Sequence, residues 1–191
     1  FKEVLDVEAR ARDGLFEYDV ATEVGRSLAR QFPQIDAAWD ARIDAAVFGV
    51  MRAEYETRHD ALPTLRALKQ SGRKTGLLSN TQFRSHNHIE DLRAKGLAPW
   101  LDAMTFSIVE GVRKPQPGIF AAALAALDAA PEAAVMVGDT IEADIEGARA
   151  VGMKTILVCT PDNAAAIAAG RHGADAVVRC LSETPKIVDS L

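Results

Sequence analysis

Residues 135–148 read VMVGDTIEADIEGA, a short apolar run followed by a glycine and two spaced acidic residues, Asp139 and Asp144. The run Val135–Val137 is typical of a strand buried on both faces, and the apolar spacing after Thr140 is typical of a helix. This stretch therefore predicts a strand, a turn and a helix, with both carboxylates beside the end of the strand.

The same unit repeats along the rest of the chain. Further short apolar runs are Thr75–Leu78, Met104–Val109, Thr155–Cys159 and Ala176–Val178. Helical stretches alternate with them at residues 62–71, 89–95, 118–127, 141–151 and 164–169. Continuous apolar strands that alternate with helices predict an α/β fold with a Rossmann-like parallel sheet, covered by helices on both faces.

The first third of the chain has a different composition. It is rich in Ala, Arg, Glu and Asp, with apolar residues at helical spacing, and Gly14 and the Phe32-Pro33 step are the expected interruptions. We expect about three helices here. The predicted organisation is a helical domain over residues 1–60 and an α/β core over residues 61–191.

Composition and charge exclude several classes of function. The 191 residues are 48% hydrophobic and 26% charged, as in ordinary globular proteins, and the net charge of −5 disfavours nucleic-acid and anionic-membrane partners. The longest apolar stretch, Ile119–Leu127, is too short for a membrane span. Two separated cysteines, Cys159 and Cys180, suggest neither a disulfide framework nor a zinc site, so we expect a cytoplasmic protein. The oligomeric state stays open.

Polar residues follow three of the predicted strands. Ser79 and Asn80 follow the first run, Lys114 lies in the loop after the second, and Asp139 follows the third. Because the carboxyl ends of parallel strands share one edge of a sheet, we expect these side chains to converge. A hydroxyl, backbone N–H groups and an ammonium suit a phosphoryl group. Asp139 and Asp144 together suit Mg²⁺.

Each of these residues also has a plain structural interpretation. Asp139 or Ser79 could cap a helix, and Lys114 could be a solvated loop cation. The pattern as a whole favours the phosphoryl and metal site. His86 and His88 stand two apart and do not share a helix face, so we expect surface histidines rather than metal ligands.

Three stretches at these positions resemble the haloacid dehalogenase-like (HAD) hydrolase superfamily, and specifically its phosphatases with a helical cap. They are Leu77–Thr81, Glu110–Phe120 and Val135–Ala148 with Gly152. Their order and spacing agree with the family, and the resemblance covers the chain from about Thr64 to its end. It implies that the helical first third is the cap.

The resemblance also implies a role for each site residue. Ser79 would hold a phosphate oxygen, helped by the backbone of Asn80 after it, and Lys114 would neutralise the phosphoryl group and the nucleophile. Asp139 would bind Mg²⁺ directly, and Asp144 would lie in the outer shell of the metal or orient Lys114. The implied activity removes phosphate from a small phosphorylated metabolite through an aspartyl-phosphate.

The chain departs from the family at the nucleophile. HAD phosphatases attack phosphate with an aspartate of an Asp-x-Asp-x-Thr motif at the end of the first strand, and these residues contain no such motif. The nearest stretch is Val4–Glu8, in which Asp6 follows no apolar strand. Residues 1–5 fit better as part of the first cap helix. We therefore expect the first strand and its catalytic loop to be absent, and the 191-residue chain to be inactive alone.

A sheet without that strand should show its absence. In the family the first strand is central, between the strands that end at Ser79 and Gly138. We expect either a vacant position between Thr75–Leu78 and Val135–Val137 or an intruding strand.

Two other functions stay open. One is a metal-free dehalogenase of the same superfamily, against which the acidic pair Asp139 and Asp144 counts. The other is a catalytically inactive binding module that keeps the phosphate and metal contacts without the chemistry.

Overall fold

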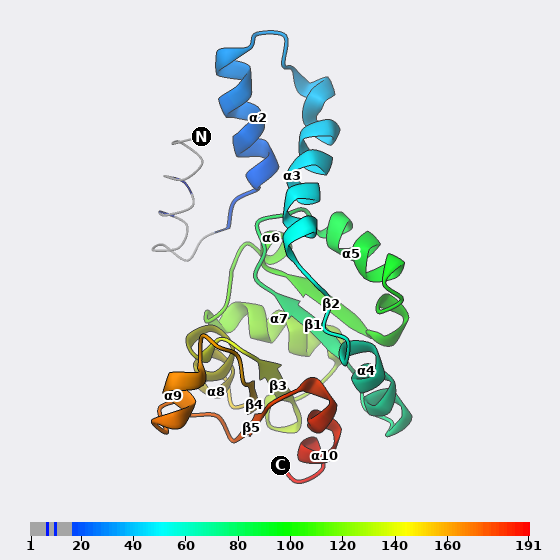
Figure 1. The fold of residues 1–191 in the computed structure, drawn as a ribbon, viewed down its shortest axis with the longest axis vertical. Coiled ribbons are helices and arrows are strands. Elements are labelled where there is room, and N and C mark those ends of the chain that lie inside the picture. Colours follow the sequence, from blue (N-terminus) through cyan, green and yellow to red (C-terminus); the bar gives the residue numbers. More distant parts are fainter. Residues whose placement is uncertain (1–6, 8–9, 11–16) are drawn as a thin grey trace.

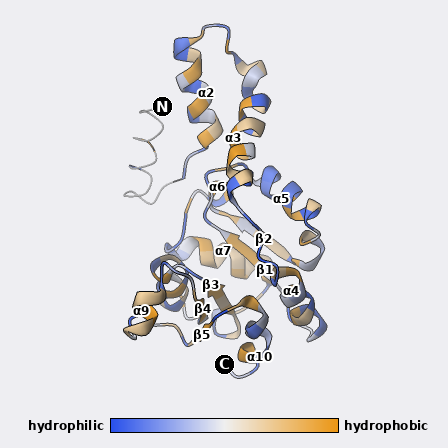
Figure 2. Cartoon of the chain, viewed as in Figure 1, coloured by the Kyte–Doolittle hydropathy of each residue, from blue (hydrophilic) through white to orange (hydrophobic). Residues whose placement is uncertain are grey.

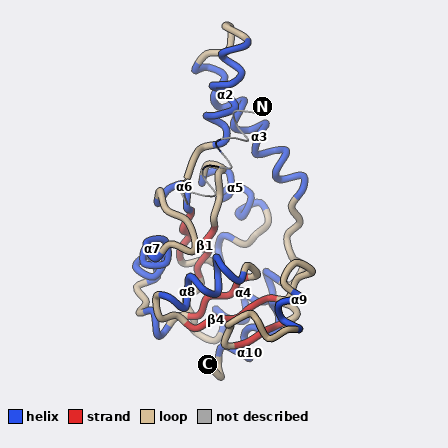
Figure 3. Tube along the Cα trace, turned by 90° about the vertical axis from the view of Figure 1, so that its left-hand side faces the viewer, coloured by secondary structure: helices blue, strands red, loops and turns tan. Residues whose placement is uncertain are grey.

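The computed structural model describes residues 7, 10 and 17–191 as a helical arm that stands on an α/β core (Figure 1). The arm rises from one end of the core, as the side view also shows (Figure 3). Asp6 and Gly14, both named in the sequence analysis, lie outside the described residues.

The helical arm, residues 20–54, consists of α2 (Val20–Gln31), a 3₁₀ turn η1 (Ala37–Trp39) and α3 (Asp40–Glu54). Asp19 caps α2, because its Oδ1 accepts hydrogen bonds from the N–H groups of Ala21 and Thr22. The first helix ends before the Phe32-Pro33 step, as expected. The two long helices pack side by side as a hairpin (Figure 1).

The core contains the five strands that the sequence predicts. They are β1 (Gly76–Ser79), β2 (Ala103–Phe106), β3 (Val135–Gly138), β4 (Lys154–Val158) and β5 (Ala176–Val178), and every pairing is parallel. The second strand is shorter than expected. Residues 107–109 belong to the short helix α6 (Ser107–Glu110), which Gly111 ends in the left-handed conformation at φ 70°.

Helices and single turns connect these strands. They are α4 (Ala61–Gln70), α5 (Ser85–Ala94), η2 (Ala98–Trp100), α7 (Pro117–Leu127), η3 (Pro131–Ala133), η4 (Ile141–Glu146), α8 (Gly147–Ala150), α9 (Ala164–Ala168), η5 (Leu181–Glu183) and α10 (Thr184–Val188). The last of them, α10, was not predicted from the sequence. No helix within residues 17–191 is both long and apolar enough to cross a membrane.

The strands form two separate half-sheets. One pairs β1 with β2, with Leu78 opposite Thr105; the other has the order β3–β4–β5, with Val137 opposite Ile156. Among the described residues, β1 and β3 do not pair and no strand lies between them. The expected vacant position is therefore confirmed for this part of the chain.

Helices pack on both faces of β3. Met136 is buried in one cluster with Ile119 and Phe120 of α7, a helix that is hydrophobic along most of its length (Figure 2). Val135 and Val137 pack in another cluster that includes Ile187 and Val188. Because successive side chains of a strand point to opposite faces, α7 and α10 lie on opposite sides of the sheet.

A cavity of about 680 Å³ lies between the half-sheets, and we call it the slot. It is lined by residues of both β1 and β3, by α4 and α10, and by α7. The slot is partly open to solvent, so it is a gap between the two half-sheets rather than a void sealed in the interior.

Asp60 joins the start of α4 to the turn before α10. Its carboxylate is buried, and Oδ2 accepts hydrogen bonds from the N–H groups of Leu181 at 2.6 Å and Ser182 at 3.3 Å. Burial pushes the pKa of Asp60 upward, but the hydrogen bonds from Leu181 and Ser182 and the charge of Arg58 outweigh it. The net effect lowers the pKa below its ordinary value.

We predict that Asp60→Asn lowers the free energy of unfolding by about 2 kcal/mol at pH 7, because two hydrogen bonds to a charged acceptor are weakened. The folded-state pKa lies below the unfolded one, so the contribution is present above the ordinary Asp pKa and is lost as pH falls through the folded value. Urea denaturation at pH values from 7 downward measures this. The exposed Asp162→Asn is the control. A difference between wild type and Asp60→Asn that does not narrow in acid would contradict the assignment.

Candidate functional site

Lys114 connects the carboxyl ends of the two half-sheets. Its Nζ donates to the carbonyl oxygen of Leu78 in β1 at 3.0 Å and to Oδ1 of Asp144 at 2.6 Å. The Lys114 side chain is 11% exposed and that of Asp144 is 6% exposed. The ammonium is thus fixed in position, and a small part of its surface still faces solvent.

Asp144 uses its other oxygen to hold the turn after β3. Its Oδ2 accepts from the N–H groups of Asp139 at 3.1 Å and Thr140 at 3.0 Å. Asp144 lies in η4, a single turn of π-helix in which the N–H groups of both Asp144 and Ile145 reach the carbonyl oxygen of Thr140. Such wide turns occur often at functional sites. Both oxygens of Asp144 are therefore engaged by protein groups.

Two glycines allow this close packing. A Cβ on Gly138 would stand 2.3 Å from Oδ2 of Asp144. A Cβ on Gly147 would stand 2.8 Å from the ring of Phe120 and 3.0 Å from the Cα of Pro115, the residue after Lys114. Glycine at 138 and 147 thus lets the β3 turn and the Lys114 loop approach each other.

Asn80 holds the Lys114 loop through its side chain. The N–H of Lys114 donates to Oδ1 of Asn80 at 2.8 Å, and Nδ2 of Asn80 donates to the carbonyl oxygen of Lys114 at 3.0 Å. Any contact from Asn80 to a phosphate would therefore use its backbone. The hydroxyl of the half-buried Ser79 has a long contact of 3.4 Å to the carbonyl oxygen of Asn80, which leaves it able to turn toward a ligand.

Asp139 is exposed, and its backbone is anchored by a residue that the sequence analysis missed. Nδ2 of Asn163 donates to the carbonyl oxygens of Asp139 and Val158, each at 2.9 Å. Asn163 is 5% exposed, and its Oδ1 accepts from the N–H of Thr160. Asn163 follows β4, so the search for polar residues after each strand that found Asp139 could also have found it.

The acidic side chains differ in their fitness for a metal. The described residues contain no group of three His, Cys, Asp or Glu side chains placed to hold one ion. Mg²⁺, however, uses one or two carboxylates and keeps several waters. The exposed Asp139 fits such direct contact, with Thr140 Oγ1 at 3.3 Å from its Oδ1. Asp144 is buried, and its oxygens already accept hydrogen bonds from Lys114, Asp139 and Thr140, so it is less open to direct metal contact than Asp139.

The two histidines have structural surroundings. His88 is half-buried rather than at the surface, with Nε2 2.7 Å from Oγ1 of Thr81 and its ring against Phe48 and Phe106. Burial lowers the pKa of His88, although Asp91 opposes the shift. His86 is exposed, and its Nε2 lies 3.1 Å from Asp44.

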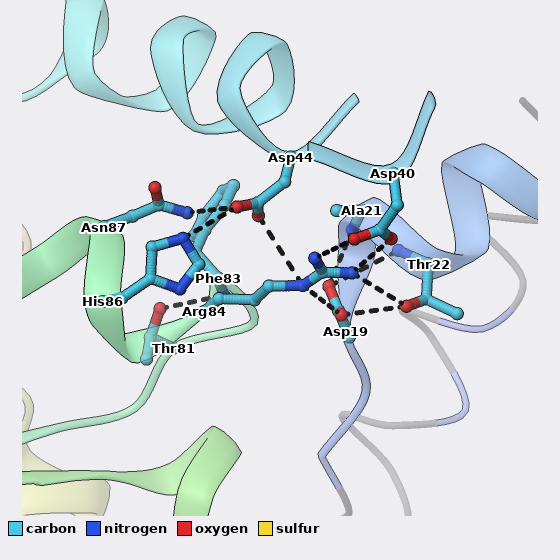
Figure 4. A network of polar contacts seen from close by, with 10 residues as sticks. All are labelled: Asp19, Ala21, Thr22, Asp40, Asp44, Thr81, Phe83, Arg84, His86 and Asn87. Carbon is cyan, nitrogen blue, oxygen red and sulfur yellow. Dashed lines mark hydrogen bonds and ion pairs between the residues drawn. The ribbon is translucent and has the colours of Figure 1, made fainter. Parts of the chain in front are cut away.

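Arg84 joins the core to the helical arm (Figure 4). Its Nε lies 2.7 Å from Oδ2 of Asp19, its two terminal nitrogens lie 2.6 and 2.8 Å from the carboxylate of Asp40, and Asp44 lies 3.8 Å away. We call these four residues the arm junction. The hydrogen bonds that Arg84 donates to Asp40 and then to Asp19 raise the pKa of Arg84, and Arg84 in turn lowers the pKa of Asp40. Arg84 follows Ser79 by five residues, so the arm junction is attached to the segment that leaves β1.

Comparisons with known proteins agree with this architecture. A model of the haloacid dehalogenase-like hydrolase family matches residues 5–152. This chain is 41% identical to the glyceraldehyde 3-phosphate phosphatase of Pyrococcus furiosus over 96 residues, half of the chain. It is 34% identical to the ribulose-1,5-bisphosphate 5-phosphatase of Halopiger xanaduensis over 122 residues, 64% of the chain. These matches span only 39% and 46% of the two relatives.

A solved structure also resembles the fold along nearly the whole chain. The 2-haloacid dehalogenase of Pseudomonas syringae matches with a TM-score of 0.71 over 99% of this chain and 80% of its own. At 23% identity the likeness concerns the fold alone, including the helical arm.

We predict that Gly138→Ala displaces the Asp144 carboxylate and lowers the free energy of unfolding by about 1–3 kcal/mol, the usual cost of overpacking. Gly49→Ala is the matched control. Gly49 lies in α3, and a Cβ there would meet no atom within 4 Å, so alanine should be neutral or stabilising by about 0.5–1 kcal/mol. Urea denaturation measures both, and equal effects at the two positions would contradict the packing argument.

We also predict that Arg84→Gln loosens the helical arm, because a planar guanidinium satisfies two carboxylates that an amide cannot. Amides of α2 and α3 should then exchange with deuterium roughly tenfold faster, while those of β4 stay unchanged. The control is Arg26→Gln, which removes an exposed pair with Glu23 within α2. If the amides of the arm exchange equally fast in both variants, the arm junction does not hold the arm in place.

Proposed function

Because this chain belongs to the haloacid dehalogenase-like hydrolases, we propose that it carries most of the active site of a phosphatase for a small phosphorylated metabolite, with Mg²⁺ as the cofactor. The observation that carries the proposal is the fixed Lys114 ammonium between the ends of β1 and β3, held by Asp144, whose other oxygen binds the backbone N–H of the exposed Asp139. The names of the two phosphatase relatives support the substrate class.

Lys114 and Ser79 are the proposed phosphate contacts. Phosphoryl transfer requires positioning and charge stabilisation more than covalent chemistry from most of the protein. Lys114 would place a positive charge against the phosphoryl oxygens, and Asp144 would keep Nζ from turning away. Ser79 would donate its hydroxyl to a phosphate oxygen, with the backbone N–H of Asn80 beside it.

Asp139 is the proposed direct ligand of Mg²⁺, and Asp144 is proposed to act in the outer shell and to orient Lys114. When bound, Mg²⁺ would neutralise charge on the phosphoryl oxygens. The hydrogen bond from Asn163 to the carbonyl oxygen of Asp139 would keep this carboxylate at the rim of the site.

The covalent step of the proposal needs an attacking carboxylate. None of the described residues places one at the site as the nucleophile. A carboxylate oxygen would attack phosphorus, the bond to the leaving oxygen would break, and a neighbouring acid would protonate that oxygen. The same acid would then take a proton from water as the water attacks phosphorus. Cleavage of the acyl-phosphate bond would release phosphate and restore the carboxylate.

The helical arm is proposed to act as a cap, with the cap over residues 1–60 and the core over residues 61–191. Its base contacts the loop after β1, where the N–H of Val20 donates to the carbonyl oxygen of Gln82 at 3.1 Å. An arm held there can exclude water from the reaction and select the substrate.

The test is a titration of the chain with inorganic phosphate, with and without Mg²⁺. Lys114→Met should weaken phosphate binding about tenfold or more, the loss expected for one charge-assisted hydrogen bond. Lys154→Met, an exposed lysine at the opposite end of the sheet, should leave binding unchanged. Asp139→Asn should abolish the effect of Mg²⁺. If the two lysine variants bind phosphate with equal affinity, the proposal is wrong.

Turnover separates this function from the two others. The assay uses the protein together with a source of the nucleophile carboxylate. The substrates tested are glyceraldehyde 3-phosphate, ribulose 1,5-bisphosphate and 2-chloropropionate. Phosphate release that depends on Mg²⁺ supports the phosphatase. Chloride release without Mg²⁺ identifies a dehalogenase, and phosphate binding without either reaction identifies an inactive binding module.

A further inference from the structure

We propose that Arg113 binds a second anionic group of the substrate, a carboxylate or a phosphate, while Lys114 binds the phosphoryl group that is removed. The inference rests on the proposed function and deepens it. It narrows the substrate class from any small phosphorylated metabolite to one that carries two anionic groups.

Arg113 lies where the Lys114 loop passes from the core to the base of the arm. The side chain of Val112 packs against the buried cluster around α7, whereas that of Arg113 reaches Glu17, two residues before the N-cap of α2. Figure 1 shows α6, which precedes this loop, at the base of the arm. Consecutive side chains of the loop thus reach the core, the arm and, at Lys114, the edge of the sheet.

The guanidinium of Arg113 has several N–H donors, and none of them donates a hydrogen bond to another described residue. Its side-chain contact there is an ion pair, with Nε 3.6 Å from Oε1 of Glu17, although the Arg113 side chain is only 19% exposed. Arg84, at 24% exposure, donates to the carboxylates of both Asp19 and Asp40. Because buried polar groups are normally hydrogen-bonded, Arg113 lacks the partner that an arginine in such surroundings usually has.

Solvent still reaches the nitrogen atoms of Arg113. Within the part of the chain that the structure describes, the fully buried side-chain polar atoms without a hydrogen-bond partner belong to Glu17, Asp91 and Thr184. Atoms that solvent reaches are also open to a ligand. The donors form a planar fork that matches two oxygens of a carboxylate or of a phosphate.

Glu17 holds one edge of the guanidinium without occupying its donors. The Glu17 side chain is 3% exposed, and neither carboxylate oxygen accepts a hydrogen bond of ordinary geometry from the described residues. Burial raises the pKa of Glu17, while the nearby Ser107 hydroxyl and the charge of Arg113 oppose the shift. An ion pair without a hydrogen bond keeps Nε in place and leaves both terminal nitrogens for another anion.

Both cations are held against the segment that leaves β1. The side chain of Asn80 binds the backbone of Lys114, and the N–H of Thr81 donates to the Ser107 hydroxyl at 2.8 Å, next to Glu17. Neighbouring Cα atoms are about 3.8 Å apart. The ammonium and the guanidinium therefore extend from one short piece of backbone, and a single small metabolite can contact both.

The plain alternative is that Arg113 only compensates the buried charge of Glu17. That role would make Arg113 matter for stability alone. Binding of a second anionic group would instead make the choice of ligand depend on Arg113, so the two interpretations differ in a measurable way.

The test compares two pairs of ligands by isothermal titration calorimetry with the 191-residue chain and Mg²⁺. One pair is 3-phosphoglycerate and glycerol 3-phosphate, and the other is ribulose 1,5-bisphosphate and ribulose 5-phosphate. The first member of each pair has the second anionic group. It should bind about tenfold or more tightly in at least one pair, the gain expected for one charge-assisted contact. A preference in the first pair identifies a carboxylate, and one in the second pair identifies a phosphate.

Four variants locate the preference. Arg113→Gln should remove it and leave the affinity for glycerol 3-phosphate nearly unchanged, and Arg113→Lys, which keeps the charge without the fork, should retain only part of it. Arg171→Gln, an exposed arginine before β5 at the opposite end of the sheet, should retain all of it. Lys114→Met should weaken the binding of all four ligands and keep the preference.

Equal binding within both pairs by the wild-type chain would overturn the proposal, as would a preference that Arg113→Gln retains. Arg113 would then only compensate the charge of Glu17. If Lys114→Met leaves all four affinities unchanged, the proposed function is wrong, whereas a preference lost in Arg113→Gln still locates an anion site at Arg113. Failure of the wild-type chain to bind any of the four ligands contradicts both proposals.

Discussion

The hydrogen bonds of the Lys114 ammonium are the constraint on which the site depends, because they tie one half-sheet to the other. Asp144 can reach Nζ only because Gly138 offers no Cβ, and the Lys114 loop can come close only because Gly147 offers none. A buried ion pair gains little stability by itself, since desolvation offsets the attraction. Its value here is geometric: Asn80 and Asp144 together leave the ammonium a single position at the sheet edge.

Much of the core was predictable because its strands are buried on both faces and therefore appear as uninterrupted apolar runs. The same rule predicted too long a strand at the end of β2. Ile108 and Val109 continue the apolar pattern, yet Ser107 turns the chain into α6, where its buried hydroxyl accepts a hydrogen bond from the N–H of Thr81. That bond joins residues 26 positions apart, and nothing in the local sequence announces it. Ser79, Lys114 and Asp139 were chosen as candidates because they follow strands. The carboxyl ends of parallel strands share one edge of the sheet, so this rule applies to any parallel sheet.

Roles that depend on distant partners were beyond such rules. Asn80 was expected to help bind phosphate through its backbone, and the sequence did not indicate that its side chain lies on the backbone of Lys114, 34 residues away. Arg84 meets Asp19 across 65 residues and Asp40 across 44, and a lone arginine in a loop carries no sign of either. For Asp144, the family resemblance implies a place in the outer shell of the metal or the orientation of Lys114, and its contacts with Lys114 and with the N–H groups of Asp139 and Thr140 are compatible with both.

Among the described residues, the split of the sheet also doubles the number of strand edges. A continuous sheet of five strands has two edges, whereas the two half-sheets have four, of which the inner two border the slot. Bare edges invite pairing between molecules and hence aggregation, and proteins often guard them with covering segments. Here α4, α7 and α10 line the slot around those inner edges. The helices that pack against the half-sheets thus also surround the two inner edges, at which a strand of another molecule could pair.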